Sequence, residues 1–432
     1  MNMEIKRDRY LQQLIDSQWD GQAKVITGIR RCGKSFLLHT LFRNYLISNG
    51  VDESHILTYR LDLVKDVRFR NPMVLASTVR ERVEGQSGQY YLFVDEIQMS
   101  RKLPDPYDPN GVEITFYDGL NDLLTLDNLD IYVTGSNSKM LASDILTEFR
   151  GRGHEIRLHP LTFGEIYSTT GGDRNEVFDQ YMFYGGMPVV LLRKSDTAKM
   201  SYLKSLFAEV YVKDILQRKK IQHPELLEPL IDVLSSAIGS LSNPTNIYNV
   251  MVSANNIKES LNTIVQYIDY LKDAFLFSEC RQYDVKGKDY LRQPFKYYSE
   301  DVGLRNARLG FRQQEATHIV ENIVYNELVA RGFSVDVGVV KTNEMKNGKM
   351  TGLSKEIDFI ATGGNGKKFY IQTAYMMPTP EKEQSERKSL LLVRNAFPKI
   401  IVQRDTVRRW YDDDGILHVN LIDFLLDESI LK

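Results

Sequence analysis

The sequence predicts an α/β protein whose first part is built on a parallel β-sheet. Residues 23–38 (AKVITGIRRCGKSFLL) place a glycine-rich loop between a short apolar strand and an apolar helix. Strand-like and amphipathic helical segments then alternate along the chain, as they do in a parallel sheet with crossover helices. A third observation is the apolar run Tyr90–Asp95, which has the pattern of a strand buried on both faces and is followed by Glu96.

The glycine-rich loop has the spacing GxxxxGK[ST], which is typical of a phosphate-binding loop. Its glycines let the backbone N–H groups point inward, and the positive end of the following helix completes a concave anion site. We expect Lys34 to contact the β- and γ-phosphates and the Ser35 hydroxyl to bind Mg²⁺. A strand-to-helix turn that binds nothing is the alternative. The residues expected to line the nucleotide are Gly28, Ile29, Arg30, Arg31, Cys32, Gly33, Lys34, Ser35 and Phe36.

Length and composition set limits on the class of protein. The 432 residues, 42% of them hydrophobic, suffice for about three domains of ~150 residues. The net charge of −2 gives no global basic field, so nucleic-acid contact needs a local patch. The two cysteines, Cys32 and Cys280, make no disulfide framework or metal cluster. Without a signal peptide or an apolar run near ~20 residues, we expect a cytoplasmic protein with no membrane contact.

Two carboxylates end the buried strand that follows the loop. In a doubly wound sheet, ligands bind at the carboxyl ends of the strands. We therefore expect Asp95 to hold Mg²⁺ through water and Glu96 to act as the general base that polarises the attacking water. An Asp-Glu pair alone is ordinary surface, but its place behind a buried strand downstream of the loop favours function.

Three further side chains are candidates for completing the site. Asn137 follows the apolar strand Ile131–Thr134, and we expect it to sense the γ-phosphate, with a helix N-cap as the alternative. Arg150 and Arg152 lie in a loop that contains glycines. One of them, with Arg152 favoured, is expected to stabilise transition-state charge in a neighbouring subunit, which requires a homo-oligomer; a solvated loop is the alternative.

Taken together, several motifs resemble the prokaryotic AAA+-type ATPases that carry a C-terminal domain of unassigned function. These motifs are GIRRCGKS, FVDEIQ, YVTGSNS, FRGRGHEIRLHPLTFGEI, YGGMP and YVKDIL. The resemblance covers essentially the whole chain and is most specific in the ATPase motifs. It implies ATP rather than GTP as the nucleotide, an ATPase core in residues 1–160, and a helical lid or linker in residues 161–222.

Residues 223–300 are expected to form a winged helix, because three helical patterns precede a β-hairpin. The family resemblance agrees with this expectation. The presumed recognition helix mixes acidic, amide and basic side chains, so direct reading of DNA is weakly supported. The hairpin is the better candidate for contacting phosphates, through Lys286, Lys288, Arg292 and Lys296.

The order α-β-β-β-α-β in residues 301–432 resembles the restriction-endonuclease-like fold. That fold gathers Mg²⁺ between an acid on the first helix, an aspartate on the second strand and an ExK motif on the third. Glu321 (or Glu327) and Asp358 match the first two positions, whereas the third strand carries Gln372 and has alanine at the lysine position. Lys367 and Lys368 lie on the preceding turn and would have to move to take the place of that lysine, so we do not expect nuclease activity.

Three hypotheses for the function follow. The first is a Mg²⁺-dependent ATPase whose nucleotide state moves the winged helix and the nuclease-like domain, bound to DNA or to a protein. The second is a nucleotide-gated protein-interaction module in which slow hydrolysis serves as a timer. The third is an ATP-controlled DNA nuclease.

Overall fold

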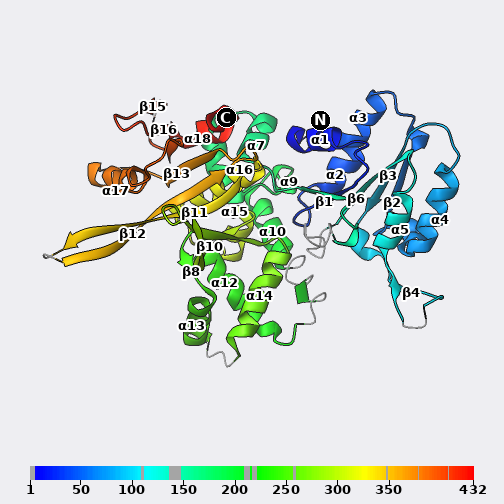
Figure 1. The fold of residues 1–432 in the computed structure, drawn as a ribbon, viewed down its shortest axis with the longest axis horizontal. Coiled ribbons are helices and arrows are strands. Elements are labelled where there is room, and N and C mark those ends of the chain that lie inside the picture. Colours follow the sequence, from blue (N-terminus) through cyan, green and yellow to red (C-terminus); the bar gives the residue numbers. More distant parts are fainter. Residues whose placement is uncertain are drawn as a thin grey trace. The chain divides into compact units, whose positions relative to one another are not determined.

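In the computed structural model the chain divides after residue 159 into two compact units, which are shown in Figure 1. We call them the N-terminal unit and the C-terminal unit. The structure describes residues 5–108, 111–135, 147–208, 215–216, 221–255, 259–346, 349–377, 379–406 and 408–432.

The N-terminal unit contains a five-stranded sheet in the order β2-β3-β6-β1-β7, and every pair in it is parallel. This confirms the predicted parallel sheet. The strands are β1 (Ala23–Thr27), β2 (Ile56–Arg60), β3 (Tyr90–Asp95), β6 (Leu129–Thr134) and β7 (Gly153–Arg157). The helices are α1 (Asp8–Asp16), α2 (Lys34–Phe36), the π-helical η1 (Leu37–Phe42), α3 (Arg43–Ser48), α4 (Pro72–Val83) and α5 (Phe116–Leu123), with 3₁₀ turns η2 (Glu53–His55), η3 (Val64–Arg70) and η4 (Ile97–Met99).

The central strands of this sheet lie between two layers of helix, so their sequences are apolar on both faces. All residues of β1 and β6 are buried, including Lys24 and Asp130, whose side chains form an ion pair of 2.6 Å. The strand-like pattern of residues 56–63 (ILTYRLDL) predicts a strand up to Leu63, but β2 ends at Arg60. Three prolines in residues 101–111 predict an irregular segment, but β4 (Leu103–Pro104) lies there and pairs with β5 (Glu113–Ile114).

The C-terminal unit begins with helices in the region predicted as a lid: α7 (Phe163–Thr170), α8 (Arg174–Tyr184), α9 (Pro188–Leu191) and α10 (Asp196–Ser205). A buried carboxylate holds the turn between α8 and α9, because Asp301 accepts a 2.6 Å hydrogen bond from the Gly186 amide. A Cβ on Gly303 would lie 1.9 Å from the Tyr184 carbonyl oxygen, so no side chain fits there. These helices are thus built into the C-terminal unit, and their role as a lid stays a prediction.

A nine-stranded mixed sheet, β15-β16-β14-β13-β12-β11-β9-β10-β8, organises the rest of this unit. Its strands are β8 (Leu241–Ser242), β9 (Phe277–Asp284), β10 (Asp289–Ser299), β11 (Ser334–Lys346), β12 (Lys349–Thr362), β13 (Lys368–Ala374), β14 (Lys399–Gln403), β15 (Trp410–Tyr411) and β16 (Leu417–Asn420). The helices are α12 (Leu227–Ser236), α13 (Pro244–Asn255), α14 (Leu261–Asp273), α15 (Val302–Arg308), α16 (Ala316–Ala330), α17 (Pro380–Leu391) and α18 (Leu421–Leu426), with 3₁₀ turns η7 (Pro224–Leu226) and η8 (Glu428–Leu431).

The predicted order of elements is present in both halves of this unit. Three helices precede the β9–β10 hairpin, and α16 precedes the β11–β12–β13 meander. However, β9 pairs in parallel with β11, so the presumed wing and the C-terminal strands share one sheet. The sequence pattern predicts strands over residues 334–340 and 356–361, and β11 and β12 extend well past these ranges as a long hairpin (Figure 1). The winged-helix and restriction-endonuclease-like assignments, and the boundary at residue 300, stay predictions.

Candidate nucleotide-binding site

The phosphate-loop motif lies directly after β1, at the carboxyl edge of the parallel sheet. Gly28 has φ +133°, and a Cβ at this position would lie 2.1 Å from the Leu158 carbonyl oxygen. Only glycine fits there, since both the backbone angle and the contact exclude a side chain. Cys32 is buried, and its Sγ lies 3.4 Å from the same oxygen, so this side chain packs the loop against Leu158.

The helix after the loop starts at Lys34 and runs through α2, η1 and α3 to Ser48. The first N–H groups of a helix have no partner within the helix, so they face the loop as anion donors. The Lys34 side chain is only 5% exposed, and its Nζ donates to the carbonyl oxygens of Gly28 (2.9 Å) and Ile29 (3.0 Å). Both acceptors are neutral carbonyl oxygens, which are weaker acceptors than a charged phosphate oxygen.

Asp95 is the last residue of β3, and β6 lies between β3 and β1, the strand that precedes the loop. The Asp95 side chain nevertheless contacts Ser35 at the end of the loop. Ser35 Oγ donates to Asp95 Oδ1 over 3.1 Å, and Thr134 Oγ1, from the last residue of β6, donates to the same oxygen. His39 Nε2 and Arg60 Nε lie 3.5 and 3.6 Å from Asp95 Oδ2. The structure thus brings together the two predicted metal ligands.

The electrostatic surroundings keep the Asp95 carboxyl ionised. Asp95 is 1% exposed, and burial alone acts to raise its pKa. The contacts with His39, Thr134 and Ser35 outweigh burial, so the pKa lies below its usual value. A buried carboxylate that stays charged beside a serine hydroxyl is a donor set that suits Mg²⁺, which prefers oxygen ligands and keeps several waters.

The residue after Asp95, Glu96, has a left-handed backbone, with φ +58°. Such backbone is strained for a residue other than glycine and clusters at functional sites. The Glu96 N–H donates to Thr134 Oγ1 over 3.2 Å, and its carboxylate accepts a hydrogen bond from Gln98. Glu96 therefore stands next to the site with its side chain tied to a neutral amide.

Sequence reasoning missed the three other partners of Asp95, although each carried a signal. His39 follows Ser35 by four residues and therefore shares its helix face. Thr134 and Arg60 are the last residues of the two strands that flank β3, and the carboxyl ends of parallel strands meet at one edge. The predicted sensor, Asn137, lies outside the described residues.

The two candidate arginines lie away from the phosphate loop. The Arg152 carbonyl oxygen accepts from the Ala23 N–H over 2.8 Å, which places Arg152 beside the amino end of β1. The loop follows the other end of this strand, about 17 Å further at ~3.3 Å per residue. The Arg152 guanidinium lies 3.4 Å from Asn121, whereas Arg150 is 71% exposed and 3.7 Å from Asp118. Arg152 is thus remote from the loop of its own chain.

The three nuclease-like residues come together in the C-terminal unit, around a lysine that the sequence reasoning assigned elsewhere. Gln372 Oε1 accepts from the Asp358 N–H (3.3 Å), and Lys296 Nζ lies 2.7 Å from Glu321 Oε1 and 4.0 Å from Asp358 Oδ1. The prediction that Lys296 is an exposed phosphate contact is wrong, because its side chain is 3% exposed. Lys367, one of the two lysines on the preceding turn, donates to the Lys432 carbonyl oxygen.

The alternative acid on α16, Glu327, pairs with Arg331 at 2.7 Å and takes no part in this cluster. Within the described part of the chain, no group of three His, Cys, Asp or Glu side chains is arranged to hold a metal ion. The Mg²⁺ that the nuclease resemblance implies therefore does not fit these residues as they stand.

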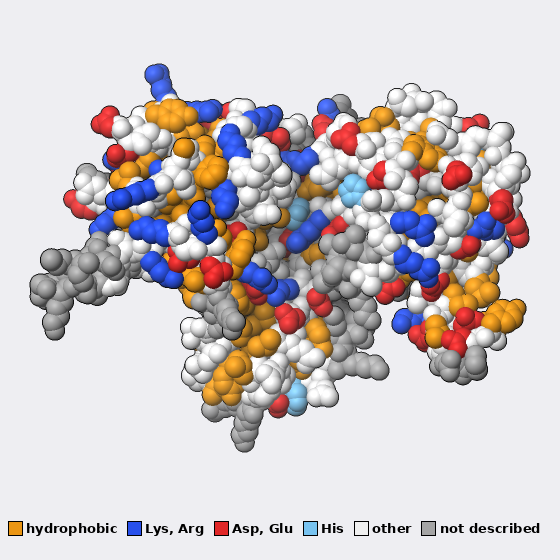
Figure 2. Space-filling model, in the orientation of Figure 1, with side chains coloured by type: hydrophobic (Ala, Val, Ile, Leu, Met, Phe, Trp, Pro, Cys, Tyr) orange, Lys and Arg blue, Asp and Glu red, His pale blue; other side chains and the backbone are white. Residues whose placement is uncertain are grey.

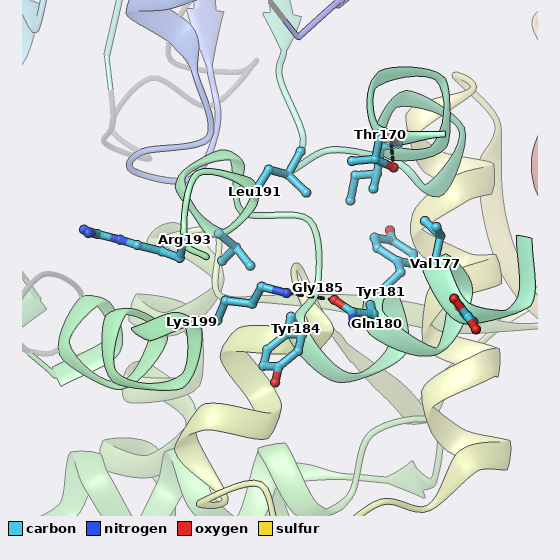
Figure 3. Close-up of a pocket in the computed structure, with 12 residues that line it drawn as sticks. Thr170, Val177, Gln180, Tyr181, Tyr184, Gly185, Leu191, Arg193 and Lys199 are labelled. Carbon is cyan, nitrogen blue, oxygen red and sulfur yellow. Dashed lines mark hydrogen bonds between the residues drawn. The ribbon is translucent and has the colours of Figure 1, made fainter. Parts of the chain in front are cut away.

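A separate cavity of ≈ 240 Å³ lies among α7, α8, α9 and α10 of the C-terminal unit (Figure 3). Lys199 crosses it to donate to Gln180 Oε1 over 2.7 Å, and its ammonium lies 4.7 Å from the centre of the Tyr184 ring. None of the predicted site residues lines it. Because its one central cation already has an acceptor and an aromatic face, we assign no ligand to this cavity.

On the face that Figure 2 shows, acidic side chains lie among the Lys and Arg side chains of each unit. Among the helices that the structure describes, none has the length and apolar character needed to cross a bilayer.

Comparison with known families agrees with the geometry of the loop. Residues 20–167 match a family described as an AAA domain, and residues 175–315 match a domain of unknown function. The protein is therefore a P-loop ATPase of the AAA type with a C-terminal domain of unassigned function, as its motifs predicted.

Two uncharacterised relatives match nearly the whole chain. The protein is 31% identical over 430 residues to an uncharacterised protein of Haemophilus influenzae, with 98% of each chain covered. The chain therefore belongs to the same family as the Haemophilus influenzae protein. An uncharacterised protein of Methanocaldococcus jannaschii is 26% identical over 421 residues, covering 93% of this chain and 84% of its own. A Walker-type ATPase of Pyrococcus abyssi superposes with a TM-score of 0.48 at 15% identity, covering 71% of this chain and 96% of its own.

Proposed function

We propose that the protein binds MgATP at the phosphate loop, hydrolyses it, and uses the nucleotide state to change how the C-terminal unit binds DNA or a protein. The observation that carries this proposal is the 3.1 Å contact between Ser35 Oγ and the buried, ionised Asp95 carboxylate, beside a lysine held only by loop carbonyls. Phosphate binding needs a cation that can move to it, and metal binding needs a carboxylate that stays charged; the site has both.

Each residue has a distinct role in the proposed reaction. Lys34 exchanges the carbonyl oxygens of Gly28 and Ile29 for the β- and γ-phosphate oxygens, which are stronger acceptors because they are charged. Ser35 and Asp95 hold Mg²⁺, which supplies charge neutralisation on the phosphates. Thr134 and His39 orient Asp95, so the carboxylate keeps its position and its charge.

Glu96 is the proposed general base. It polarises the attacking water once its carboxylate exchanges the Gln98 amide for that water. Arg152, remote from its own loop, is proposed to act on the nucleotide of a neighbouring subunit, which makes turnover depend on protein concentration.

The test compares matched pairs of variants in the N-terminal unit. Lys34→Ala should lose MgATP binding, and Glu96→Gln should keep binding while turnover falls by about 10²–10⁴-fold. Lys102→Ala and Glu113→Gln are the controls. Lys102 Nζ and Glu113 Oε2 lie 3.3 Å apart in an exposed ion pair, which is not part of the loop. Unchanged turnover in Glu96→Gln would remove Glu96 as the base, and wild-type-like binding in Lys34→Ala would remove the site.

A second candidate function is a nucleotide-gated protein-interaction module. Two lysines of the presumed winged helix are engaged within the chain: Lys272 on α14 pairs with Asp269 (3.2 Å) and Glu279 (3.0 Å), and Lys296 is buried. Fewer free cations favour a protein over DNA as the partner. Binding to duplex DNA at increasing salt separates the two, because phosphate contacts weaken steeply with salt; a flat response or no binding favours the protein partner.

A further inference from the structure

The C-terminal unit contains a buried ammonium surrounded by three carboxylates. Lys296 Nζ lies 2.7 Å from Glu321 Oε1, 2.6 Å from Glu356 Oε1 and 4.0 Å from Asp358 Oδ1. The lysine side chain is 3% exposed, and those of Glu321 and Asp358 are 8% and 9% exposed. Charges are rarely buried to this extent unless they are paired, so the cluster is held together by its one cation.

Three elements position these groups. Glu321 projects from α16, and Glu356 and Asp358 stand two residues apart on β12, which puts them on one face of that strand. Lys296 comes from β10, where Tyr298, two residues on, donates to Glu321 Oε1 over 2.6 Å. Each side chain is thus fixed from a different direction.

The Asp358 carboxylate is anchored by its other oxygen. Asp358 Oδ2 accepts from the Thr373 N–H (2.8 Å) and from the Thr373 hydroxyl (2.7 Å), which leaves Oδ1 facing the ammonium. The arrangement is oxygen-rich, convergent and rigid, which are the features by which carboxylates select a hard divalent cation.

The ammonium takes the place that such a cation would need. Burial and, after it, the neighbouring Asp358 charge raise the pKa of Glu321 to about 7, whereas the contact with Lys296 acts to lower it. At 2.6–2.7 Å from two of the carboxylates, Nζ leaves no room between them for an ion with oxygen ligands of its own. This explains why the described residues form no metal site although the nuclease-like acids are together.

We propose that Lys296 is a built-in cation that occupies the divalent-cation position of this carboxylate cluster. The wild-type cluster then binds no metal and serves to join α16, β10 and β12. Replacing Lys296 by a neutral side chain of similar length converts the cluster into a divalent-cation site, with Asp358 reaching the ion after a small shift or through a water. The opposite arrangement, a lysine that works beside a bound metal, requires the wild-type protein to bind the ion.

The test measures Mn²⁺ binding to the full chain without nucleotide, from the loss of the free-ion electron paramagnetic resonance signal. Six proteins are compared: wild type, Asp358→Asn, Lys296→Met, Lys296→Gln, Lys296→Met/Asp358→Asn, and the control Lys286→Met, which removes an exposed lysine bonded to a backbone carbonyl. Thermal unfolding with and without Mn²⁺ is the second readout, because a ligand that binds only the folded state raises Tm.

We expect one Mn²⁺ per chain and a raised Tm in Lys296→Met alone, with binding weakened at least about tenfold by the added Asp358→Asn. A Lys296→Met chain that folds only when Mn²⁺ is present gives the same answer. Wild-type binding that Asp358→Asn abolishes overturns the proposal, because the lysine then coexists with the metal. It is equally overturned if neither Lys296→Met nor Lys296→Gln binds Mn²⁺ or is stabilised by it.

Discussion

The two units each contain a buried lysine near carboxylates, and the two lysines differ in what they bond. Lys34 donates to the neutral carbonyl oxygens of Gly28 and Ile29, whereas Lys296 donates to the carboxylates of Glu321 and Glu356. A neutral carbonyl oxygen is a weaker hydrogen-bond acceptor than a phosphate oxygen, whereas a carboxylate is charged and is as strong an acceptor as phosphate. The first lysine is therefore free to exchange partners, and the second is fixed.

The same comparison applies to the two aspartates. Asp95 and Asp358 are both nearly buried and both anchored by a threonine hydroxyl, Thr134 or Thr373. Asp95 faces Ser35 beside the phosphate loop, whereas Asp358 faces a lysine. The nuclease-like residue types therefore do not by themselves predict metal binding at Asp358, because Lys296 already supplies the cation there.

Stability should show the largest difference between the two lysines. Lys296→Met leaves buried carboxylates without their cation and should lower the free energy of unfolding by ~3–5 kcal/mol. Lys34→Met breaks bonds to two carbonyls only, and a loss of ~1 kcal/mol or less is expected. Denaturant unfolding of both variants checks this, and equal losses would contradict the distinction between a fixed and an exchangeable lysine.

Turnover should show the reverse order. Lys34→Met should reduce ATP turnover by about 10²–10³-fold, because a donor to the transferring phosphate is removed. Lys296→Met, measured per folded molecule under stabilising conditions, should stay near the wild-type rate. A large loss of turnover in Lys296→Met would mean that the cluster acts on the nucleotide site.

The pH dependence of stability should sharpen the account of the cluster. The pKa of Glu321 is raised from 4.5 to about 7, so between these values the folded state binds the proton more tightly than the unfolded chain. Proton binding by Glu321 therefore contributes on the order of 1–3 kcal/mol to the free energy of unfolding. This contribution is complete below pH ~4.5 and is lost as the pH rises through about 7. Unfolding measured from pH 4.5 to 8 should show this decline, and Glu321→Gln should flatten it. An unchanged slope in that variant would rule out Glu321 as its source.

The smallest expected effects compare the two threonines. Thr134→Val and Thr373→Val each remove a hydroxyl donor to a buried carboxylate and should each cost ~1–2 kcal/mol of stability. Only Thr134→Val should also slow ATP turnover, because it frees Asp95 beside the proposed metal. Steady-state kinetics on both variants decide this, and equal turnover would remove Thr134 from the site.

The sequence predicted the loop, the parallel sheet and the order of most elements, because these depend on local patterns. Gly28, Lys34 and Ser35 lie within one motif, and Asp95 ends a recognisable buried strand. What the sequence did not predict are contacts between distant elements. The sequence around Lys296 predicts a hairpin with basic residues. The packing of α16 against β10 and β12 is needed to show that the Lys296 ammonium is buried. His39, Thr134 and Arg60 likewise become partners of Asp95 only when three strand ends meet at one edge.

The claim on which the functional account rests is that a movable ammonium and the inward amides of the loop capture the phosphates of ATP. Titration calorimetry of the folded wild-type protein with MgATP tests it most directly. The account predicts saturable heat with one site per chain, abolished in Lys34→Met and retained in Lys296→Met; an absence of binding heat from the folded wild type would contradict it.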